Sequence, residues 1–295
     1  MTPYVADPVY LNGRFLPLAD AGVSPLDRGY LYGDGVYEVI PVYSRQPFRI
    51  DEHLTRLQAT LNGVKLANPL DVAGWKAVIQ QLIAAAPWED QSVYLQVTRG
   101  ADNKRDHAFP PAGVPPGVFA YAGPLVTPTA ELRARGVSAI TVPDQRWARC
   151  DLKVISLLAN ILARQQAIDA GCAEALLIRD GYLKEGAASN IFVVRDGLLL
   201  APPKTQLMLP GITYDLVLEL AIAHGQPVKV AEISEAELRS ADEVWMTSST
   251  KEILAITTLD GVPVGNGIHA GKPGAYGERM WQWYQDFKNT IMRKG

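Results

Sequence analysis

The middle of the chain reads Arg146-Trp147-Ala148-Arg149-Cys150-Asp151-Leu152-Lys153-Val154-Ile155. Lys153 stands there among apolar neighbours, where a lysine gains little as a surface charge. The residues that follow predict an amphipathic helix over 156–170, and Gly171 suits the left-handed position after a helix end. A lysine just ahead of a helix start faces the positive end of the helix dipole, which together with burial disfavours the charged ammonium. The position therefore predicts a neutral, nucleophilic amine at Lys153.

A neutral lysine amine can form a Schiff base with an aldehyde cofactor such as pyridoxal phosphate. The alternative is a lysine that extends from a domain surface into solvent and has no chemical role. A cofactor of this kind needs three more groups from the protein: an acid at the pyridine nitrogen, a site for the phosphate and a group that holds the substrate. Residues elsewhere in the chain therefore decide between the two interpretations.

Length and composition limit the class of protein. The chain has 295 residues, of which 48% are apolar, and its mean hydropathy is +0.01. These values are typical of a globular protein with two domains or one large one. A net charge of -3 from 28 basic and 31 acidic residues provides no basic surface for nucleic acid or for a membrane. The expected partners are small molecules or proteins.

Cysteine content and the N-terminus indicate a compartment. Cys150 and Cys172 are the only cysteines, too few for a disulfide framework or a C-x-x-C metal site, so we expect no metal and a reducing cytoplasm. The first residues lack the charged and apolar regions of a signal peptide, and no apolar run approaches the roughly 18 residues of a membrane span. The sequence therefore predicts a cytoplasmic protein.

Residues 1–122 predict a small α/β domain. Two apolar runs joined by Asn12-Gly13 predict a β-hairpin over 9–16, because Asn-Gly supplies the positive φ angles of a tight turn. The segment 24–35 is rich in glycine and aromatic residues and lets backbone approach a ligand or a neighbouring chain; a loop that only caps the next strand is the alternative. The other expected elements are a strand over 36–43, helices over 51–62 and 71–85, and strands over 92–98 and 118–122.

A polar loop and a linker follow. Arg105 and His107 lie in a long loop with four prolines, and loops of this length in compact domains are often functional. Prolines at 124 and 128 interrupt both the helical and the strand periodicity, so 123–135 is expected to be an interdomain linker.

Residues 136–295 predict a larger, cofactor-binding domain. Turn signals at Asp180-Gly181 and Asp196-Gly197 separate apolar runs that predict a meander of hairpins over 173–194 and beyond. Aromatic residues in the C-terminal segment 277–293 predict a helix that packs on a core. The other expected elements are a strand over 137–142, helices over 213–224 and 234–239, and a strand over 243–246.

Two sets of residues suit the groups that a pyridoxal cofactor needs. Glu185 enters a run of small residues, 186–190, which can lie flat beside a ring, and its carboxylate would keep a ring nitrogen protonated; an exposed glutamate after a turn is the alternative. Gly211-Ile212-Thr213 opens a helix whose free N–H groups can bind phosphate, and the hydroxyl-rich turn 247–250 follows a strand. Plain helix capping explains these residues equally well. Arg56, which lies off the leucine face of its helix, is an anion ligand or an ordinary solvated charge.

Six motifs, taken in order along residues 9–252, resemble those of the fold-type IV pyridoxal-phosphate enzymes, a family of D-amino acid, branched-chain and (R)-amine transaminases and aminodeoxychorismate lyase. They are Asp27-Arg28-Gly29-Tyr30, Gly33-Asp34-Gly35-Val36-Tyr37-Glu38, Arg149-Cys150-Asp151-Leu152-Lys153, Glu185-Gly186 with Ser189-Asn190, Gly211-Ile212-Thr213 and Thr247-Ser248-Ser249. The resemblance implies an α/β (α+β) fold with a small N-terminal α/β domain and a larger C-terminal domain that has a β-barrel-like core. It also implies pyridoxal 5′-phosphate as cofactor.

The resemblance also implies roles for single residues. Lys153 would be the Schiff-base lysine and proton carrier, and Glu185 would meet the pyridine nitrogen. Arg105-Asp106-His107 resembles the loop that D-amino acid aminotransferases use, with a tyrosine at the position of Tyr37, to hold the substrate α-carboxylate. The phosphate would be bound by Arg56, Ile212, Thr213, Ser248 and Ser249.

The function that these roles imply is transamination of D-amino acids with 2-oxo acids, of the D-alanine and 2-oxoglutarate type. An (R)-amine or branched-chain transaminase and a pyruvate-releasing lyase are the alternatives within the family. A non-catalytic module that binds a phosphorylated metabolite is disfavoured, because phosphate binding alone needs neither Lys153 nor Glu185. The family also implies a homodimer whose partners are amino acid and 2-oxo acid substrates rather than nucleic acid or membrane.

Overall fold

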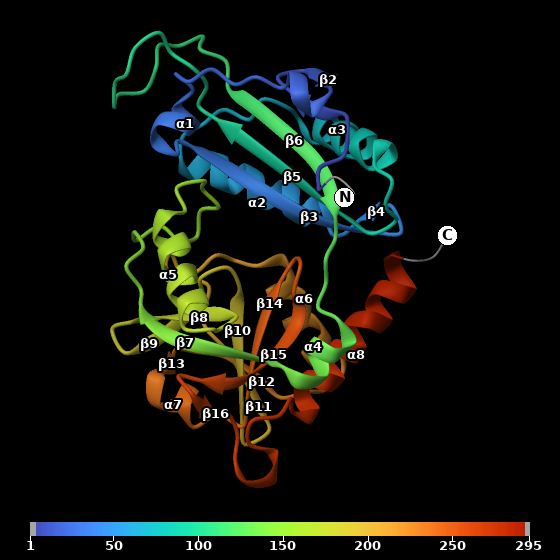
Figure 1. Cartoon of the computed structure of the whole chain (residues 1–295), viewed down its shortest axis with the longest axis vertical. Coiled ribbons are helices and arrows are strands. Elements are labelled where there is room, and N and C mark those ends of the chain that lie inside the picture. Colours follow the sequence, from blue (N-terminus) through green and yellow to red (C-terminus); the bar gives the residue numbers. More distant parts are fainter. Residues whose placement is uncertain (1–3, 293–295) are drawn as a thin grey trace. The chain divides into compact units, whose positions relative to one another are not determined.

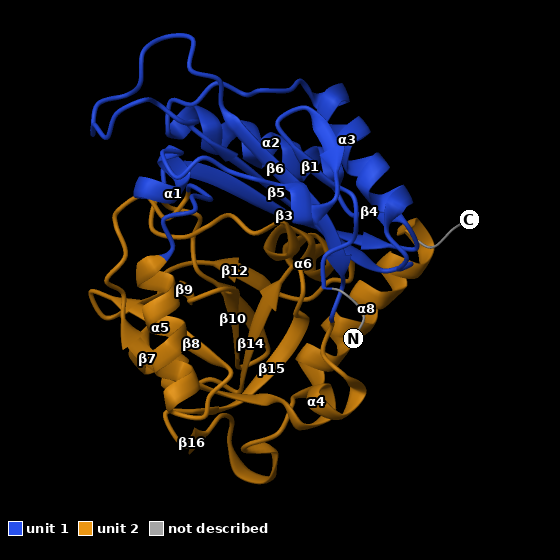
Figure 2. Cartoon of the chain, turned by 45° about the horizontal axis from the view of Figure 1, so that its top comes forward, with its two compact units in different colours: residues 1–126, 152–157, 295 blue, residues 127–151, 158–294 orange. Residues whose placement is uncertain are grey.

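The computed structural model of this chain describes residues 4–292, which form two compact units (Figure 1). The first unit holds the chain up to Val126 together with Leu152–Leu157, and the second holds Thr127–Asp151 and the chain from Leu158 onward (Figure 2). The boundaries expected from the sequence, 1–122, 123–135 and 136–295, stay a prediction. The division into units adds that the Lys153 segment belongs to the first one.

The first unit is built on a six-stranded antiparallel sheet in the order β2-β1-β6-β5-β3-β4. Leu57 and Ile79, from its two long helices, pack in one buried cluster with Ile40 and Leu95 of the sheet. The predicted hairpin is confirmed, with φ of 46° at Asn12 and 88° at Gly13. The elements are β1 (Val9–Leu11), β2 (Arg14–Leu16), α1 (Arg28–Tyr32), β3 (Gly35–Tyr43), β4 (Gln46–Pro47), α2 (Ile50–Gly63), α3 (Val72–Ala85), β5 (Gln91–Thr98) and β6 (Gly117–Pro124).

The Lys153 segment joins this sheet at the start of β3. Val154 forms an isolated antiparallel bridge with Val36. The Tyr37 N–H donates to the Lys153 carbonyl oxygen at 2.9 Å, and the Ile155 N–H donates to the Gly35 carbonyl oxygen at 3.0 Å. Leu152 and Val154 are buried in the same cluster as the sheet. The backbone at Lys153 is therefore fixed by strand-like hydrogen bonds rather than by a helix.

The second unit is built on a ten-stranded, curled sheet. Its main path runs β12-β11-β10-β14-β15-β7-β8-β9-β13, and β16 pairs with β15. β7 is parallel to both β15 and β8. The strands are β7 (Val137–Pro143), β8 (Glu174–Arg179), β9 (Tyr182–Gly186), β10 (Asn190–Arg195), β11 (Leu198–Ala201), β12 (Val228–Val230), β13 (Ile233–Ser234), β14 (Glu243–Ser248), β15 (Glu252–Leu259) and β16 (Val262–Pro263).

Helices of the second unit begin close to the predicted positions. The helix after Lys153 is α5 (Leu158–Asp169), two residues later than expected, and Gly171 has the predicted positive φ of 70°. Ser234 caps α7 (Glu235–Arg239) in a capping box with Glu237. The remaining helices are α4 (Ala130–Arg135), α6 (Ile212–Ala223) and α8 (Ala275–Phe287), with a π-helical turn over Lys288–Met292 after α8.

Some predictions about these elements are wrong. The runs over 173–194 form two hairpins, β8–β9 and β10–β11, but β9 and β10 are not paired: β9 lies between β8 and β13, and β10 between β11 and β14. A continuous meander is therefore excluded, because the partners come from distant parts of the chain. Two short helices are not predicted from the sequence: α1, within the segment 24–35, and α4, within the segment 123–135. Within residues 4–292, no helix combines the length and the apolar character needed to cross a lipid bilayer.

Candidate active site

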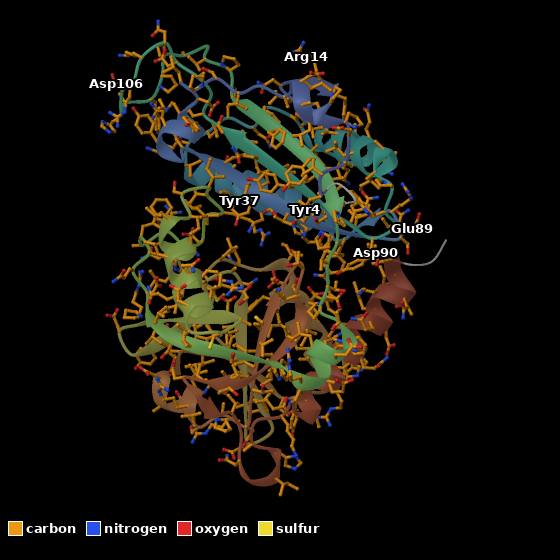
Figure 3. The ribbon with its side chains drawn as sticks, viewed as in Figure 1. Tyr4, Arg14, Tyr37, Glu89, Asp90 and Asp106 are labelled. Atoms are coloured by element: carbon orange, nitrogen blue, oxygen red, sulfur yellow. The ribbon has the colours of Figure 1, made fainter. Side chains whose placement is uncertain are left out.

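Lys153 and Tyr37 lie together in the first unit. The half-buried Lys153 places its Nζ 4.2 Å from the centroid of the Tyr37 ring. That ring, which projects from β3 (Figure 3), stacks on Tyr94 with 5.8 Å between centroids. The Lys153 backbone N–H also donates to the Thr60 hydroxyl at 3.4 Å. The main chain on both sides of the amine is therefore fixed, and only the side chain itself is left to move.

Arg56 is held by a buried carboxylate. Its Nε and Nη2 donate to the two oxygens of Glu38 at 2.7 Å each, and His53 Nδ1 lies 2.9 Å from the same carboxylate. Glu38 and His53 are fully buried. Burial alone would raise the pKa of Glu38, but the adjacent Arg56 and His53 have the larger effect. Together they hold the pKa well below its ordinary value, so that the carboxyl stays ionised. Burial lowers the pKa of His53. Arg56 is thus an oriented cation, and the reading of it as an ordinary solvated charge is wrong.

Arg105 and His107 lie in the long loop between β5 and β6, which also carries Asp106 (Figure 3). Both side chains are exposed. The Arg105 guanidinium carbon is 5.2 Å from the centroid of the Tyr32 ring, and the His107 ring is 5.5 Å from it. The structure thus groups Arg105 and His107 at Tyr32, and Tyr37 with Lys153.

Glu185 lies buried on β9 in the second unit, with 4% of its surface exposed. Arg146 Nη1 donates to Oε1, the Leu209 N–H donates to both oxygens at 3.2 and 3.3 Å, and Asn190 Nδ2 donates to Oε2 at 3.3 Å. Burial raises the pKa of Glu185 to about 7, against the opposing effect of Arg146 and the Leu209 N–H. The alternative of an exposed glutamate after a turn is wrong.

Arg146 is a residue that sequence reasoning misses. Its Nε and Nη2 each donate to Asp144 at 2.9 Å, and Nη2 also donates to the Leu207 carbonyl oxygen at 3.1 Å. Arg179 adds a second cation 3.2 Å from Asp144. The spacing Asp144-x-Arg146 indicates a local ion pair, but no local signal connects Arg146, which follows β7, to Glu185, which lies on β9.

The start of α6 is a helix end without a side-chain cap. Gly211 is the N-cap and makes no capping hydrogen bond through a side chain, so the first N–H groups of the helix have no N-cap side chain as acceptor. A Cβ on Gly211 would lie 2.0 Å from Asn190 Oδ1. Asn190 also donates to the Leu209 carbonyl oxygen at 3.0 Å. Only glycine therefore fits against Asn190, and this contact connects the helix start to Glu185.

The hydroxyl-rich turn is adjacent in the same sheet. Thr247 on β14 pairs with Asn190 on β10, and its hydroxyl lies 3.5 Å from the Asn190 carbonyl oxygen. Ser248, the next residue, accepts a hydrogen bond from the Lys251 N–H at 3.1 Å. Asn190 thus lies beside Glu185, beside the start of α6 and beside the turn that carries Ser248 and Ser249.

Each unit contains groups of a kind that a phosphorylated pyridine aldehyde requires. The first unit contains an amine, Lys153, and an oriented cation, Arg56. The second contains the start of α6, and a helix start of this kind suits a phosphate. It also contains the Glu185 carboxyl, whose pKa burial raises to about 7 and which a cationic ring N–H would favour in its ionised form. A site for phosphate alone would require neither Lys153 nor Glu185.

Comparisons with known proteins all indicate one family. The protein-family model for Amino-transferase class IV matches residues 35–259 of this chain. A D-alanine aminotransferase of Bacillus licheniformis is 40% identical over 259 residues, which are 88% of this chain and 90% of that protein. A D-alanine aminotransferase of Staphylococcus aureus (strain MW2) is 35% identical over the same share of this chain and 91% of its own.

Solved structures give the same fold. The branched-chain amino acid aminotransferase from Escherichia coli superposes with a TM-score of 0.83 at 27% identity and covers 94% of this chain and 92% of its own. A second branched-chain amino acid aminotransferase, from T.th., is complexed with N-(5'-phosphopyridoxyl)-L-glutamate. It superposes with a TM-score of 0.84 at 28% identity and covers 95% of this chain and 93% of its own. The expected fold-type IV architecture is therefore confirmed.

Proposed function

Because this chain belongs to the class IV aminotransferases, we propose that it transfers the amino group of a D-amino acid to a 2-oxo acid, with pyridoxal 5′-phosphate as cofactor. The observation that carries this proposal is the 35–40% identity to D-alanine aminotransferases over 88% of the chain. The solved branched-chain enzymes are less similar in sequence, at 27–28% identity. D-Alanine with 2-oxoglutarate is the proposed substrate pair.

The proposed cofactor ligands are the following residues. Lys153 would bind the aldehyde carbon through its amine, and Glu185 would accept a hydrogen bond from the ring nitrogen. Arg56, the N–H groups of Ile212 and Thr213, and the Ser248 and Ser249 side chains would bind the phosphate. When bound, pyridoxal phosphate supplies an aldehyde that condenses with the substrate amine and a ring that accepts electrons from the α-carbon.

Once the substrate amine has taken the place of the Lys153 amine, Lys153 Nζ would be free to move a proton at the substrate α-carbon. Its fixed backbone and the nearby Tyr37 ring restrict where Nζ can move. Arg105, His107 and the Tyr37 hydroxyl bind the substrate α-carboxylate, which orients the α C–H bond. Glu185, beside Arg146, stays ionised next to a cationic ring nitrogen and so favours the protonated ring.

Replacement of Lys153 tests the catalytic assignment. Lys153→Ala should abolish steady-state transamination between D-alanine and 2-oxoglutarate, because the chain then has no amine at that position. Pyruvate production and the absorbance of the bound cofactor are measured in parallel. Lys229→Ala, which removes an exposed lysine from β12, is the control and should leave both unchanged. Full turnover in Lys153→Ala would exclude the assignment.

The branched-chain and (R)-amine alternatives are tested with other donors, by measuring the glutamate that each donor forms from 2-oxoglutarate. D-Alanine, L-leucine and an (R)-amine are each supplied with 2-oxoglutarate. Preference for L-leucine would support a branched-chain enzyme, which is the function of the solved structures that this fold resembles. The lyase alternative needs an aminodeoxychorismate-like substrate: many turnovers of pyruvate release from that substrate, without any oxo-acid acceptor, would instead support the lyase.

We also propose that the chain is a homodimer. Helix α5 exposes four apolar side chains within one arc of its surface, and exposed apolar side chains grouped in this way are typical of a protein interface. The exposed fractions are 69% for Leu158, 59% for Ile161, 55% for Leu162 and 51% for Ile168. A second copy of this chain is the proposed occupant of this α5 face.

The cytoplasm is the proposed compartment. Cys150 and Cys172 are both free thiols. Burial raises the pKa of Cys150 to about 11, so this thiol stays protonated and unreactive at neutral pH. Two unpaired thiols suit a reducing environment.

A further inference from the structure

The motif Asp27-Arg28-Gly29, with Asp34 further on, has no part in the cofactor and substrate contacts proposed above. It forms the start of α1 next to the end of β5. Asp27 caps the helix by accepting from the Gly29 N–H at 2.7 Å, and it accepts from the Thr98 hydroxyl at 2.9 Å. The Arg28 N–H donates to the Gly100 carbonyl oxygen at 2.9 Å. The backbone of Arg28 is thus fixed where the long loop leaves β5.

The Arg28 side chain reaches into that loop. It is only 6% exposed. Nη1 donates to the carbonyl oxygens of Asp106 at 2.6 Å and Ala108 at 3.0 Å, and Nη2 donates to that of His107 at 3.4 Å. One guanidinium therefore binds three consecutive carbonyl groups. The compact ammonium of a lysine lacks the planar set of donors that this arrangement requires.

Arg28 is itself held by a carboxylate. Its Nε donates to Asp34 at 2.9 Å, and Arg99 Nε donates to both oxygens of Asp34 at 3.0 and 2.8 Å. Burial raises the pKa of Asp34, but hydrogen bonds from Arg99 and Arg28 lower it below its ordinary value. Arg99 is anchored in turn by the carbonyl oxygens of Val64 and Lys65 at 2.8 and 2.9 Å. The loop is thus connected through Arg28 to the body of the first unit.

The tripeptide 106–108 that Arg28 binds includes His107 and directly follows Arg105, the two loop residues proposed to bind the substrate carboxylate. Arg105 and His107 are exposed, and among residues 4–292 neither forms an ion pair; each lies against the Tyr32 ring. The Arg28 guanidinium carbon is 4.9 Å from the centroid of the same ring. The contacts that fix Arg105 and His107 therefore come from Tyr32 and from the backbone that Arg28 holds.

We propose that Arg28 is a positioning residue for the substrate carboxylate: its hydrogen bonds to the carbonyls of residues 106–108 set the positions of Arg105 and His107. This inference rests on the proposed function, in which Arg105 and His107 bind that carboxylate. It assigns Arg28 no contact with substrate or cofactor. Asp34 and Arg99 orient Arg28, and Arg99 also contacts the loop, since its guanidinium carbon lies 3.9 Å from the centroid of the Phe109 ring.

The test is Arg28→Lys in the holoenzyme, because lysine keeps a positive charge beside Asp34 but loses the planar set of donors. The KM for D-alanine should rise by about tenfold, the change that corresponds to the loss of one hydrogen bond from a charged donor. The kcat should change far less, and the cofactor absorbance should stay the same. Arg14→Lys on β2, an exposed arginine in the same unit, is the matched control and should change none of these values.

A second measurement reports on the loop without any turnover. Trypsin cleaves after Lys104 and Arg105, both exposed, and mass spectrometry identifies these cuts. Arg28→Lys should accelerate cleavage at these two bonds relative to the wild-type protein and to Arg14→Lys. If Arg28→Lys does not fold, Asp34→Asn, which weakens the hold on Arg28, is measured in its place with the same expected results. Unchanged KM and unchanged cleavage in the folded variant would overturn the proposal.

Arg105→Ala distinguishes the positioning role of Arg28 from the proposed role of Arg105 in binding the substrate carboxylate. If Arg105→Ala raises the KM for D-alanine and Arg28→Lys does not, the positioning role of Arg28 is wrong and the proposed function stands. If Arg105→Ala leaves the KM unchanged, the proposed carboxylate site is wrong and the positioning role is overturned with it. If both variants raise the KM, their effects in the double variant should be less than additive, because part of the effect of Arg28 passes through Arg105 and the rest through His107. Additive effects would contradict the proposal.

Discussion

Burial and the neighbouring Arg146 guanidinium shift the pKa of Glu185 in opposite directions. Its carboxyl has a pKa raised to about 7 from an ordinary value of 4.5. Between these two values the folded protein keeps a proton that the unfolded chain releases, so the free energy of unfolding falls as pH rises through this window. The shift corresponds to about 3 kcal/mol when fully expressed. Asp34 and Glu38, whose pKa values are lowered, act in the other direction and at lower pH.

The pH dependence of the cofactor-free protein therefore tests the state of Glu185. In Glu185→Gln, the fall in the free energy of unfolding between pH 4.5 and 7 should shrink by about 3 kcal/mol, because glutamine does not titrate. Urea denaturation at several pH values measures this. Glu278→Gln, an exposed residue on α8, is the control and should keep the wild-type slope. Equal slopes for wild type and Glu185→Gln would show that burial does not set this ionisation.

Single residues differ in how far the sequence predicts them. Lys153 is predictable because apolar neighbours mark it locally, and Gly211 because it precedes a helix. Arg146, Glu38 and Arg28 carry no such mark, since their partners lie on other elements. Sequence reasoning finds the residues of the candidate site more readily than the charges that hold those residues in place.

At the level of elements, the start of α6 depends on a close contact. Gly211 has an ordinary φ of −72°, so glycine is required there by space rather than by backbone conformation. Asn190 Oδ1 would lie 2.0 Å from an added Cβ, and Asn190 is itself buried and hydrogen-bonded to Leu209 and Glu185. Asn190 cannot move away without losing these bonds.

Gly211→Ala should therefore lower the free energy of unfolding of the cofactor-free protein by about 1–3 kcal/mol, the usual cost of overpacking a filled position. Chemical denaturation provides the measurement. Gly22→Ala is the control, since no atom lies within 4 Å of a Cβ built there, and it should change stability by less than about 0.5 kcal/mol. A neutral Gly211→Ala would mean that Asn190 has another low-energy position.

Elements are predicted well where the signal is local and poorly where it is not. Asp180-Gly181 and Asp196-Gly197 mark two tight turns, and both have the expected positive φ angles. The same signals cannot say that β9 pairs with β13 and β10 with β14, because a strand's second neighbour is set by packing between distant segments. Short helices such as α1 lack the repeat that periodicity needs.

At the level of the whole molecule, the α5 face predicts assembly. Light scattering should give about twice the chain mass of 32.1 kDa. Ile161→Glu should shift the protein to monomer, because it buries a charge in the proposed interface. Ile268→Glu, the same substitution at a site that is 82% exposed outside α5, is the control and should remain dimeric. A wild-type monomer at micromolar concentration would contradict the dimer.

The path of the chain is the part of the architecture that the sequence predicts least. The two-domain expectation assigns residues 136–295 to one body, whereas Leu152–Leu157 belongs to the first unit. No composition change marks this return, because Leu152 and Val154 are as suited to one core as to another. Only their burial against the first sheet shows where they belong.

Because Leu152–Leu157 belongs to the first unit, the order in which the chain leaves the ribosome affects its folding. A nascent chain that has emerged through Val126 contains the whole six-stranded sheet but not Leu152 and Val154, which belong to its buried cluster. Apolar surface on that sheet therefore stays exposed until translation has passed Leu157, when the second unit has already begun to appear. The buried cluster of the first unit is complete only after Leu152 and Val154 have been synthesised. The two units therefore cannot fold strictly one after the other.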